Sequence, residues 1–196
     1  MRIAKDWWND VLEAGMLLLA AGCLIYFLVV GSWPKVLECI LIITVLVGIR
    51  LLLKLKKTSL FPVLRTSILL FICLTMFVAN IFGMYGVIPH LDDIEHVASG
   101  VILGFVGLLV FRQISKNTNL ETFRSSMIPV WFCWFFAVAM AGCWEMYEFT
   151  TDQLLGFHSQ GGGLVDTMGD IINGSLGGTV TIMYLASLAK KGKLPL

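Results

Sequence analysis

Six stretches of this sequence are apolar over roughly the 20 residues that a helix needs to cross a bilayer. They cover residues 11–32, 36–55, 66–88, 92–111, 127–148 and 166–188, and little chain is left between them. Composition agrees, because 58% of the residues are hydrophobic and 14% are charged, against roughly 45–50% and 25% in soluble domains. We therefore predict an all-α polytopic membrane protein in which residues 1–196 form a single membrane domain with six transmembrane helices.

Basic residues predict the orientation of these helices, because Lys and Arg concentrate in cytoplasmic segments. Thirteen of the fourteen basic residues precede the first span, join spans 2 and 3 or 4 and 5, or follow span 6, and Lys35 alone lies on the other side. We expect both the N and the C terminus to be cytoplasmic. The opposite, outer side then carries most of the acidic residues and all three histidines.

Two of the predicted helices begin with the same four-residue period. The fourth reads Asp92-x₃-His96-x₃-Gly100-x₃-Gly104 and the sixth reads Asp166-x₃-Asp170-x₃-Gly174-x₃-Gly178. Residues four apart share one face of a helix, and Gly-x₃-Gly in an apolar helix lets another backbone approach closely. We expect these two helices to pack through their glycines, with their polar ends side by side.

The fifth span ends at the same outer rim with two further carboxylates. Glu145 and Glu148 are about one turn apart, and Ala137 and Ala141 lie below Glu145 on the same stripe. In the sixth helix, Asn173 lies about 10 Å deeper than Asp166 at 1.5 Å per residue. The polar track is therefore expected to enter the bilayer, where such groups must be paired, protonated or hydrated.

If these carboxylates come together without a nearby Lys or Arg, their negative charges repel one another. Retained protons or a bound cation would have to compensate this repulsion. Carboxylates with imidazole suit Zn, Mn or Fe, and carboxylates alone suit Mg or Ca. We expect a divalent metal ion (Zn, Mn or Mg) with a ligand set of Asp92, His96, Glu145, Asp166 and Asp170. Glu148 would act as a general base or orient a ligand.

The connection from Thr150 to Val165 has no clear helical period and contains the run Gly161-Gly162-Gly163. It is expected to cover the rim flexibly, with His158 as a proton donor, or to be a glycine-rich linker with an idle histidine. Asn173 is expected to be either a ligand or an interhelical hydrogen-bond partner. One of the adjacent residues Asp92 and Asp93 is expected to turn inward, and the sequence does not decide which.

The remaining motifs give no competing site. Ala20-Ala21-Gly22-Cys23 is similar to the end of a lipoprotein signal, but the apolar run continues past it and acidic residues precede it. The five cysteines lie inside predicted spans without a Cys-x₂-Cys pair, so we expect them to be packing residues. No nucleotide-binding loop is present, and no nucleic-acid partner is expected.

Three motifs in this order resemble the pattern of the YjdF-like bacterial inner-membrane proteins: Asp92-Asp93-Ile94-Glu95-His96-Val97-Ala98-Ser99-Gly100, Trp144-Glu145-Met146-Tyr147-Glu148 and Asp166-Thr167-Met168-Gly169-Asp170. A more distant similarity is to the VanZ-like proteins, a group linked with glycopeptide resistance. The resemblance covers roughly residues 66–188 and implies a multi-pass protein of the bacterial cytoplasmic (inner) membrane. It brings no established reaction.

The family's polar signature, carried over by this resemblance, falls on Asp92, His96, Glu145, Glu148, Asp166 and Asp170. Asp93 stands where relatives often have a basic residue. That departure removes a local charge partner of Asp92 and favours a bound cation or a shared proton.

These observations favour a divalent-metal-dependent hydrolase that faces outward and acts on a lipid or lipid-linked envelope substrate. A small proton- or cation-coupled transporter would use the same carboxylates during alternating access. A non-catalytic membrane partner would use the glycine faces for docking. The sequence leaves the oligomeric state open.

Overall fold

The computed structural model describes residues 6–55, 60–155, 160–161 and 163–196, and within these ranges the chain is helical and contains no strand. Six helices are long and apolar enough to cross a membrane, as predicted. The chain divides into two compact units, Met1–Leu91 and Asp92–Leu196, each of which contributes three spans.

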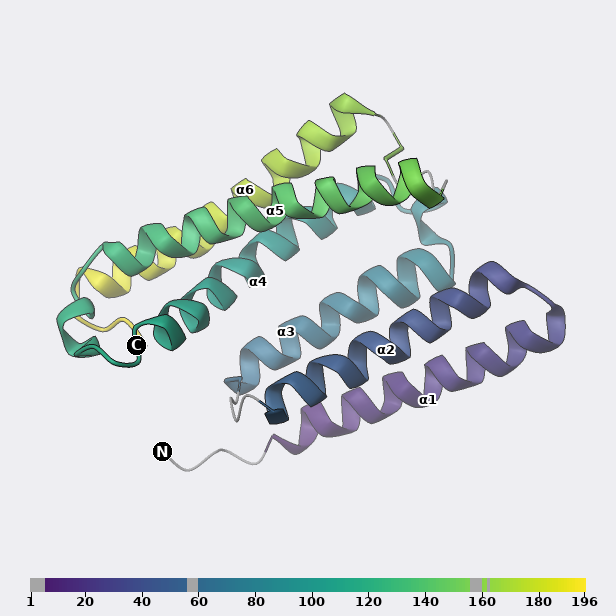
Figure 1. Cartoon of the computed structure of the whole chain (residues 1–196), viewed down its shortest axis with the longest axis horizontal. Coiled ribbons are helices and arrows are strands. Elements are labelled where there is room, and N and C mark those ends of the chain that lie inside the picture. The colour runs from purple at the N-terminus through teal and green to yellow at the C-terminus, as the bar shows by residue number, and fades with distance from the viewer. Residues whose placement is uncertain (1–5, 56–59, 156–159, 162) are drawn as a thin grey trace. The chain divides into compact units, whose positions relative to one another are not determined.

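The first unit contains α1 (Trp7–Val30), α2 (Trp33–Leu55) and a third span that begins as α3 (Pro62–Ile72). These three helices lie side by side (Figure 1). α1 ends because Gly31 adopts a left-handed conformation with φ 80°, and its N–H donates to the carbonyl of Phe27. Buried apolar residues from all three spans, among them Ala20, Ile42 and Phe77, form the core of this unit.

The third span differs from the expected stretch 66–88 at both ends. It begins at Pro62, which occupies the first turn of α3 where a missing N–H costs nothing. From Cys73 to Ile81 it continues as a π-helix. It then stops, because Gly83 is left-handed with φ 69° and a short 3₁₀ turn follows at Met84–Gly86.

A charge cluster ties α1 to α3 inside the first unit. The Arg65 guanidinium lies 3.1 Å from Asp6, 2.8 Å from Asp10 and 2.6 Å from Glu13. The buried Glu13 also pairs with Arg50 at 3.3 Å. A buried carboxylate needs such partners, because an unpaired charge at that position is costly.

A neutral hydrogen-bond chain reinforces the same junction. The buried Asn9 amide donates to the carbonyl of Pro62 at 3.0 Å, and its side-chain oxygen accepts from the Thr66 hydroxyl at 2.8 Å. The N-terminal end of α1 is therefore fixed to the N-terminal end of α3 by both ion pairs and hydrogen bonds.

The second unit contains α4 (Leu91–Ile114), which begins at the unit boundary, α5 (Ile128–Leu155) and α6 (Leu164–Ala189). A short 3₁₀ turn, Leu120–Phe123, lies between α4 and α5. The core of the second unit includes Leu108 from α4, Val130 and Cys133 from α5, and Leu185 from α6. α5 extends to Leu155 and α6 begins at Leu164, so eight residues of the expected loop from Thr150 to Val165 are helical.

The glycine pattern predicted the contact between α4 and α6 correctly. A methyl group on Gly100 would collide with the carbonyl of Gly174, and one on Gly104 would lie 2.7 Å from the Thr181 side chain. α5 also packs against α6 through small residues. A Cβ added to Gly174 would lie 2.9 Å from the Cβ of Ala141, and one added to Gly178 would lie 3.0 Å from the Cβ of Ala137.

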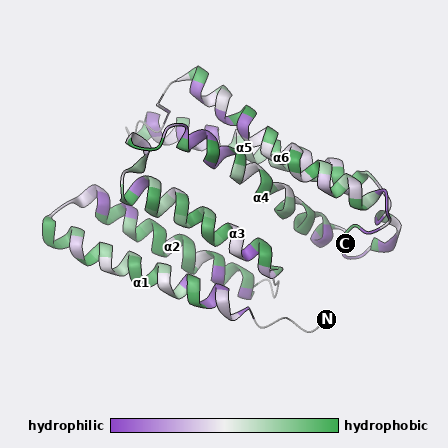
Figure 2. Ribbon diagram, turned by 180° about the vertical axis from the view of Figure 1, so that it is seen from behind, coloured by the Kyte–Doolittle hydropathy of each residue, from purple (hydrophilic) through white to green (hydrophobic). Residues whose placement is uncertain are grey.

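Hydrophobic residues cover most of the length of the six spans (Figure 2). Large apolar side chains such as Val29, Leu51, Ile172 and Met183 are exposed on their outer surfaces. Apolar surface of this extent around a helix is typical of contact with lipid. The spans therefore imply a bilayer environment, in agreement with the expected partner.

Candidate functional site

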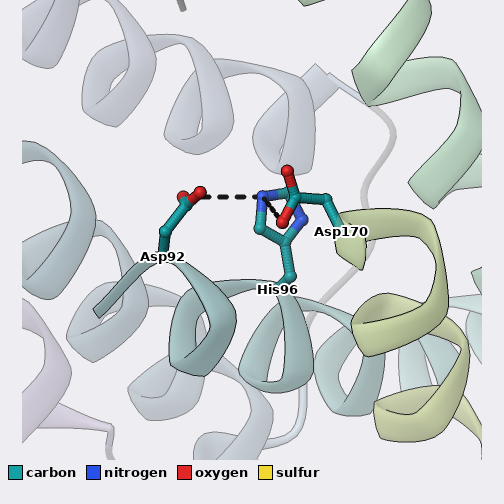
Figure 3. A group of neighbouring side chains, drawn as sticks. All are labelled: Asp92, His96 and Asp170. Carbon is teal, nitrogen blue, oxygen red and sulfur yellow. Dashed lines mark ion pairs between the residues drawn. The ribbon is translucent and has the colours of Figure 1, made fainter. Parts of the chain in front are cut away.

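Three predicted site residues gather at the first turns of α4 and the start of α6. His96 Nε2 lies 3.6 Å from Asp92 Oδ1 and 3.6 Å from Asp170 Oδ1. The two carboxylates approach the imidazole from different helices (Figure 3). One ligand atom from each residue lies within 4.8 Å of the other two, which is compact enough to surround one metal ion.

The glycine contact places these side chains together. Gly100 is one turn beyond His96 on α4, and Gly174 is one turn beyond Asp170 on α6. Because the two backbones touch at these glycines, the side chains one turn nearer the helix starts are brought opposite each other. Asp170 is nearly buried at 6% side-chain exposure, whereas Asp92 is 49% exposed, so the site is open on the Asp92 side.

Glu145 on α5 lies beside this group without belonging to it. The residue is 3% exposed, and the Thr167 hydroxyl is the one donor placed beside it among the described residues, so at least one carboxylate oxygen has no hydrogen-bond partner there. It is one turn beyond Ala141, which packs against Gly174 of α6, and it interacts electrostatically with Asp170 and His96. A buried carboxylate left without hydrogen bonds is rare and points to a missing partner.

The remaining predicted site residues are outside the group of three. Glu148 accepts a hydrogen bond from the indole N–H of Trp144 at 2.9 Å and interacts electrostatically with Glu145, His96 and Asp170. Asp166 is near enough to Asp92 to affect it electrostatically, but it is outside the group of three. His158 lies outside the described residues. The structure thus brings together three of the five expected metal ligands.

The structure decides two questions that the sequence left open. Asn173 donates to Asp93 Oδ1 at 2.6 Å, so it is an interhelical hydrogen-bond partner. Asp92, not Asp93, is the residue that faces His96. The adjacent aspartates of α4 therefore have different roles: Asp92 contributes to the charged group, and Asp93 joins α4 to α6.

Thr167 and Gln160 form a polar connection near Glu145 that the sequence did not indicate as functional. The Gln160 amide donates to Thr167 Oγ1 at 2.8 Å, and the Gln160 backbone N–H donates to Asp152 at 2.9 Å. Thr167 is a close neighbour of Glu145. Thr167 stands inside the third motif, between Asp166 and Asp170, but a lone threonine there gives no signal of its contacts.

The charge balance of this site is strongly negative. Asp92, Asp170 and Glu145 surround one imidazole, and the first basic residue of α4 is Arg112, about 24 Å along the helix from His96 at 1.5 Å per residue. An imidazole with carboxylates on facing helices is a donor set that first-row divalent metals accept. The residues present therefore fit a divalent cation.

The fold and this site define a polytopic helical membrane protein with a histidine and carboxylate centre near the start of its fourth and sixth spans. A family model described as "Predicted membrane protein (DUF2238)" matches residues 12–191, and the chain belongs to this family. The match agrees with the YjdF-like resemblance and does not show the VanZ-like one. Searches of curated proteins and of solved structures found no match.

Proposed function

We propose that this protein is a metal-dependent hydrolase of the bacterial inner membrane that binds one divalent cation at Asp92, His96 and Asp170. The observation that carries the proposal is the approach of three ligand atoms to within 4.8 Å of one another. Ligand atoms that share a zinc ion lie about 2.0–2.2 Å from it, and hence about 3–4.4 Å from each other. Small side-chain movements close that difference.

The donor set also supports catalysis over a purely structural role. Three protein ligands leave at least one coordination position for water or substrate, as in catalytic zinc sites. A divalent ion there would polarise a phosphoryl or carbonyl oxygen and activate water for hydrolysis. The exposed side of Asp92 supplies an approach to this position.

The substrate class follows from the site's place in the chain. The group lies in the first turns of a membrane span, where the basic-residue pattern predicts the outer leaflet. A molecule that reaches this depth must partition into the bilayer surface. We therefore propose the headgroup of a lipid or of a lipid-linked envelope precursor as substrate.

Metal content measured by plasma mass spectrometry on detergent-purified protein tests the proposal. We expect near-stoichiometric Zn or Mn in the native protein and its loss in His96→Ala and Asp170→Asn. Asp93→Asn is the matched control, because Asp93 bonds Asn173 and is not in the group. Native protein that stays metal-free after incubation with Zn²⁺, Mn²⁺ and Mg²⁺ would refute it.

Glu145 gives a second candidate function some support. A buried carboxylate with at least one oxygen left without a hydrogen bond from the described residues, and with electrostatic interactions with Asp170 and His96, is also what a proton-coupled carrier uses to take up and release protons. Flux of labelled cations or protons in proteoliposomes separates the two functions, because a hydrolase turns over its substrate without net transport.

A further inference from the structure

We infer that Glu145 holds a water molecule beside a cation at Asp92, His96 and Asp170, instead of joining these three residues as a ligand. This inference rests on the proposed metal site. It assigns a separate task to a residue that the sequence placed in the ligand set.

The spacing of the ligand atoms distinguishes Glu145 from the three proposed ligands. The ligand atoms of Asp92, His96 and Asp170 all lie within 4.8 Å of one another, and Glu145 does not meet this limit with all three. Two atoms bound to one ion at about 2.0–2.2 Å cannot be more than about 4.4 Å apart. A carboxylate outside that range reaches such an ion only through an intervening molecule, and water is the smallest.

Burial requires that this carboxylate have a partner. Both Glu145 oxygens are inaccessible, and the Thr167 hydroxyl is the neighbouring donor among the described residues. One hydroxyl can satisfy only one oxygen, and leaving a buried acceptor unsatisfied costs stability. Buried water commonly fills such positions when two or more polar groups surround it. Here Asp170 and His96 are among the groups that interact electrostatically with Glu145.

Thr167 and Gln160 hold Glu145 in place for this task. Thr167 Oγ1 accepts its hydrogen bond from the Gln160 amide, so the hydroxyl hydrogen of Thr167 remains to be donated elsewhere. Glu145 is the carboxylate next to it. Such outer hydrogen bonds orient the groups around metals in many sites.

In this arrangement Glu145 would orient the water molecule that reacts at the site. A water molecule bound to a cation there would donate one hydrogen bond to Glu145, and this bond would restrict the orientation of the water. Glu148 differs from Glu145 because one of its oxygens already accepts a hydrogen bond from the Trp144 indole at 2.9 Å.

The test uses full-length protein in detergent with Mn²⁺ as the probe, and it follows both Mn²⁺ stoichiometry and the exchange rate of Mn²⁺-bound water by proton relaxation. We expect Glu145→Met, which keeps the volume and removes the acceptor, to retain stoichiometric Mn²⁺. Its bound water should exchange about tenfold faster, which corresponds to loss of one hydrogen bond to a charged group.

Three variants make the result interpretable. Asp93→Asn is the control, because Asp93 bonds Asn173 and is outside the group of three, and it should leave both quantities unchanged. Asp170→Asn should lose Mn²⁺. If Glu145→Met does not fold, Glu145→Gln keeps the shape and should accelerate exchange by a smaller factor.

Two results would overturn the inference while leaving the metal site intact. Loss of Mn²⁺ from Glu145→Met as complete as from Asp170→Asn would make Glu145 a direct ligand. Unchanged water exchange in Glu145→Met would remove it from the site. Failure of the native protein to bind Mn²⁺ would instead refute the proposed metal site itself.

Discussion

Single glycines determine the geometry of the candidate site as much as its charged residues do. Gly100 and Gly177 each leave no room for a methyl group, because the backbone carbonyls of Gly174 and Val97 occupy that space. Other glycines of the same helices, such as Gly169, have nothing within 4 Å of an added Cβ. Only part of the glycine content is therefore needed for packing.

We predict that Gly100→Ala lowers the free energy of unfolding by about 1–3 kcal/mol, as overpacking does, and weakens Mn²⁺ binding because α4 must move away from α6. Thermal unfolding in detergent, with Mn²⁺ titration, measures both effects. Gly169→Ala is the matched control and should be neutral or slightly stabilising, since alanine favours helix. Equal stability of the two variants would contradict the close contact.

Glu13 shows how a buried charge depends on one partner more than on another. Arg65, at 19% side-chain exposure, joins Glu13 to Asp6 and Asp10, whereas Arg50 is 62% exposed and makes a longer pair. A partner that is itself shielded from water contributes more than an exposed one.

We predict that Arg65→Met costs about 3 kcal/mol or more, because it leaves Glu13 buried without its closest partner. Arg50→Met removes a pair to the same carboxylate and should cost under about 1 kcal/mol. Urea or thermal unfolding of the two variants provides the comparison. Adding Glu13→Gln to Arg65→Met should recover stability, and failure to do so would show that Arg65 acts through something other than this charge.

At the scale of helices, hydropathy and the four-residue pattern were sufficient to predict most of the second unit. Apolar length predicted the spans because lipid imposes a fixed thickness. The repeated glycines predicted the α4 and α6 contact because small residues at that spacing have few other uses in an apolar helix. Asp92, His96 and Asp170 then meet as a direct consequence of the register.

Several features of the helices could not be predicted from the chain. Arg65 and Glu13 are 52 positions apart, and nothing in their local sequence indicates that they pair. Glu145 was expected among the ligands, because periodicity gives the face of a helix but not the distance to a third helix. The π-helix at Cys73–Ile81 has no compositional signal that distinguishes it from an α-helix.

At the scale of the whole molecule, the family match over residues 12–191 includes spans from both compact units. The three spans of the first unit therefore belong to the family's common architecture together with those of the candidate site. The sequence predicts their orientation in the membrane, with thirteen basic residues on the cytoplasmic side and Lys35 on the other.

We predict that a cysteine at Ser32, between α1 and α2, reacts with a membrane-impermeant maleimide added to intact cells. A cysteine at Thr118, between α4 and α5, should react only after the membrane is permeabilised. Native protein gives the background from its five cysteines, which lie within the spans. Labelling of Thr118→Cys in intact cells would reverse the orientation and place the candidate site on the cytoplasmic side.

The contact between Gly100 and Gly174 is made by main-chain atoms on both sides. Main-chain atoms have no rotamers, so the separation of His96 and Asp170 above them does not vary with side-chain motion at the contact itself. Further contacts hold the same two helices over several turns: Gly177 lies against the carbonyl of Val97, and the Thr181 hydroxyl donates to the carbonyl of Val101 at 2.9 Å. Substitutions on the lipid-facing sides of α4 and α6 should therefore alter contacts with lipid without altering the spacing at the site.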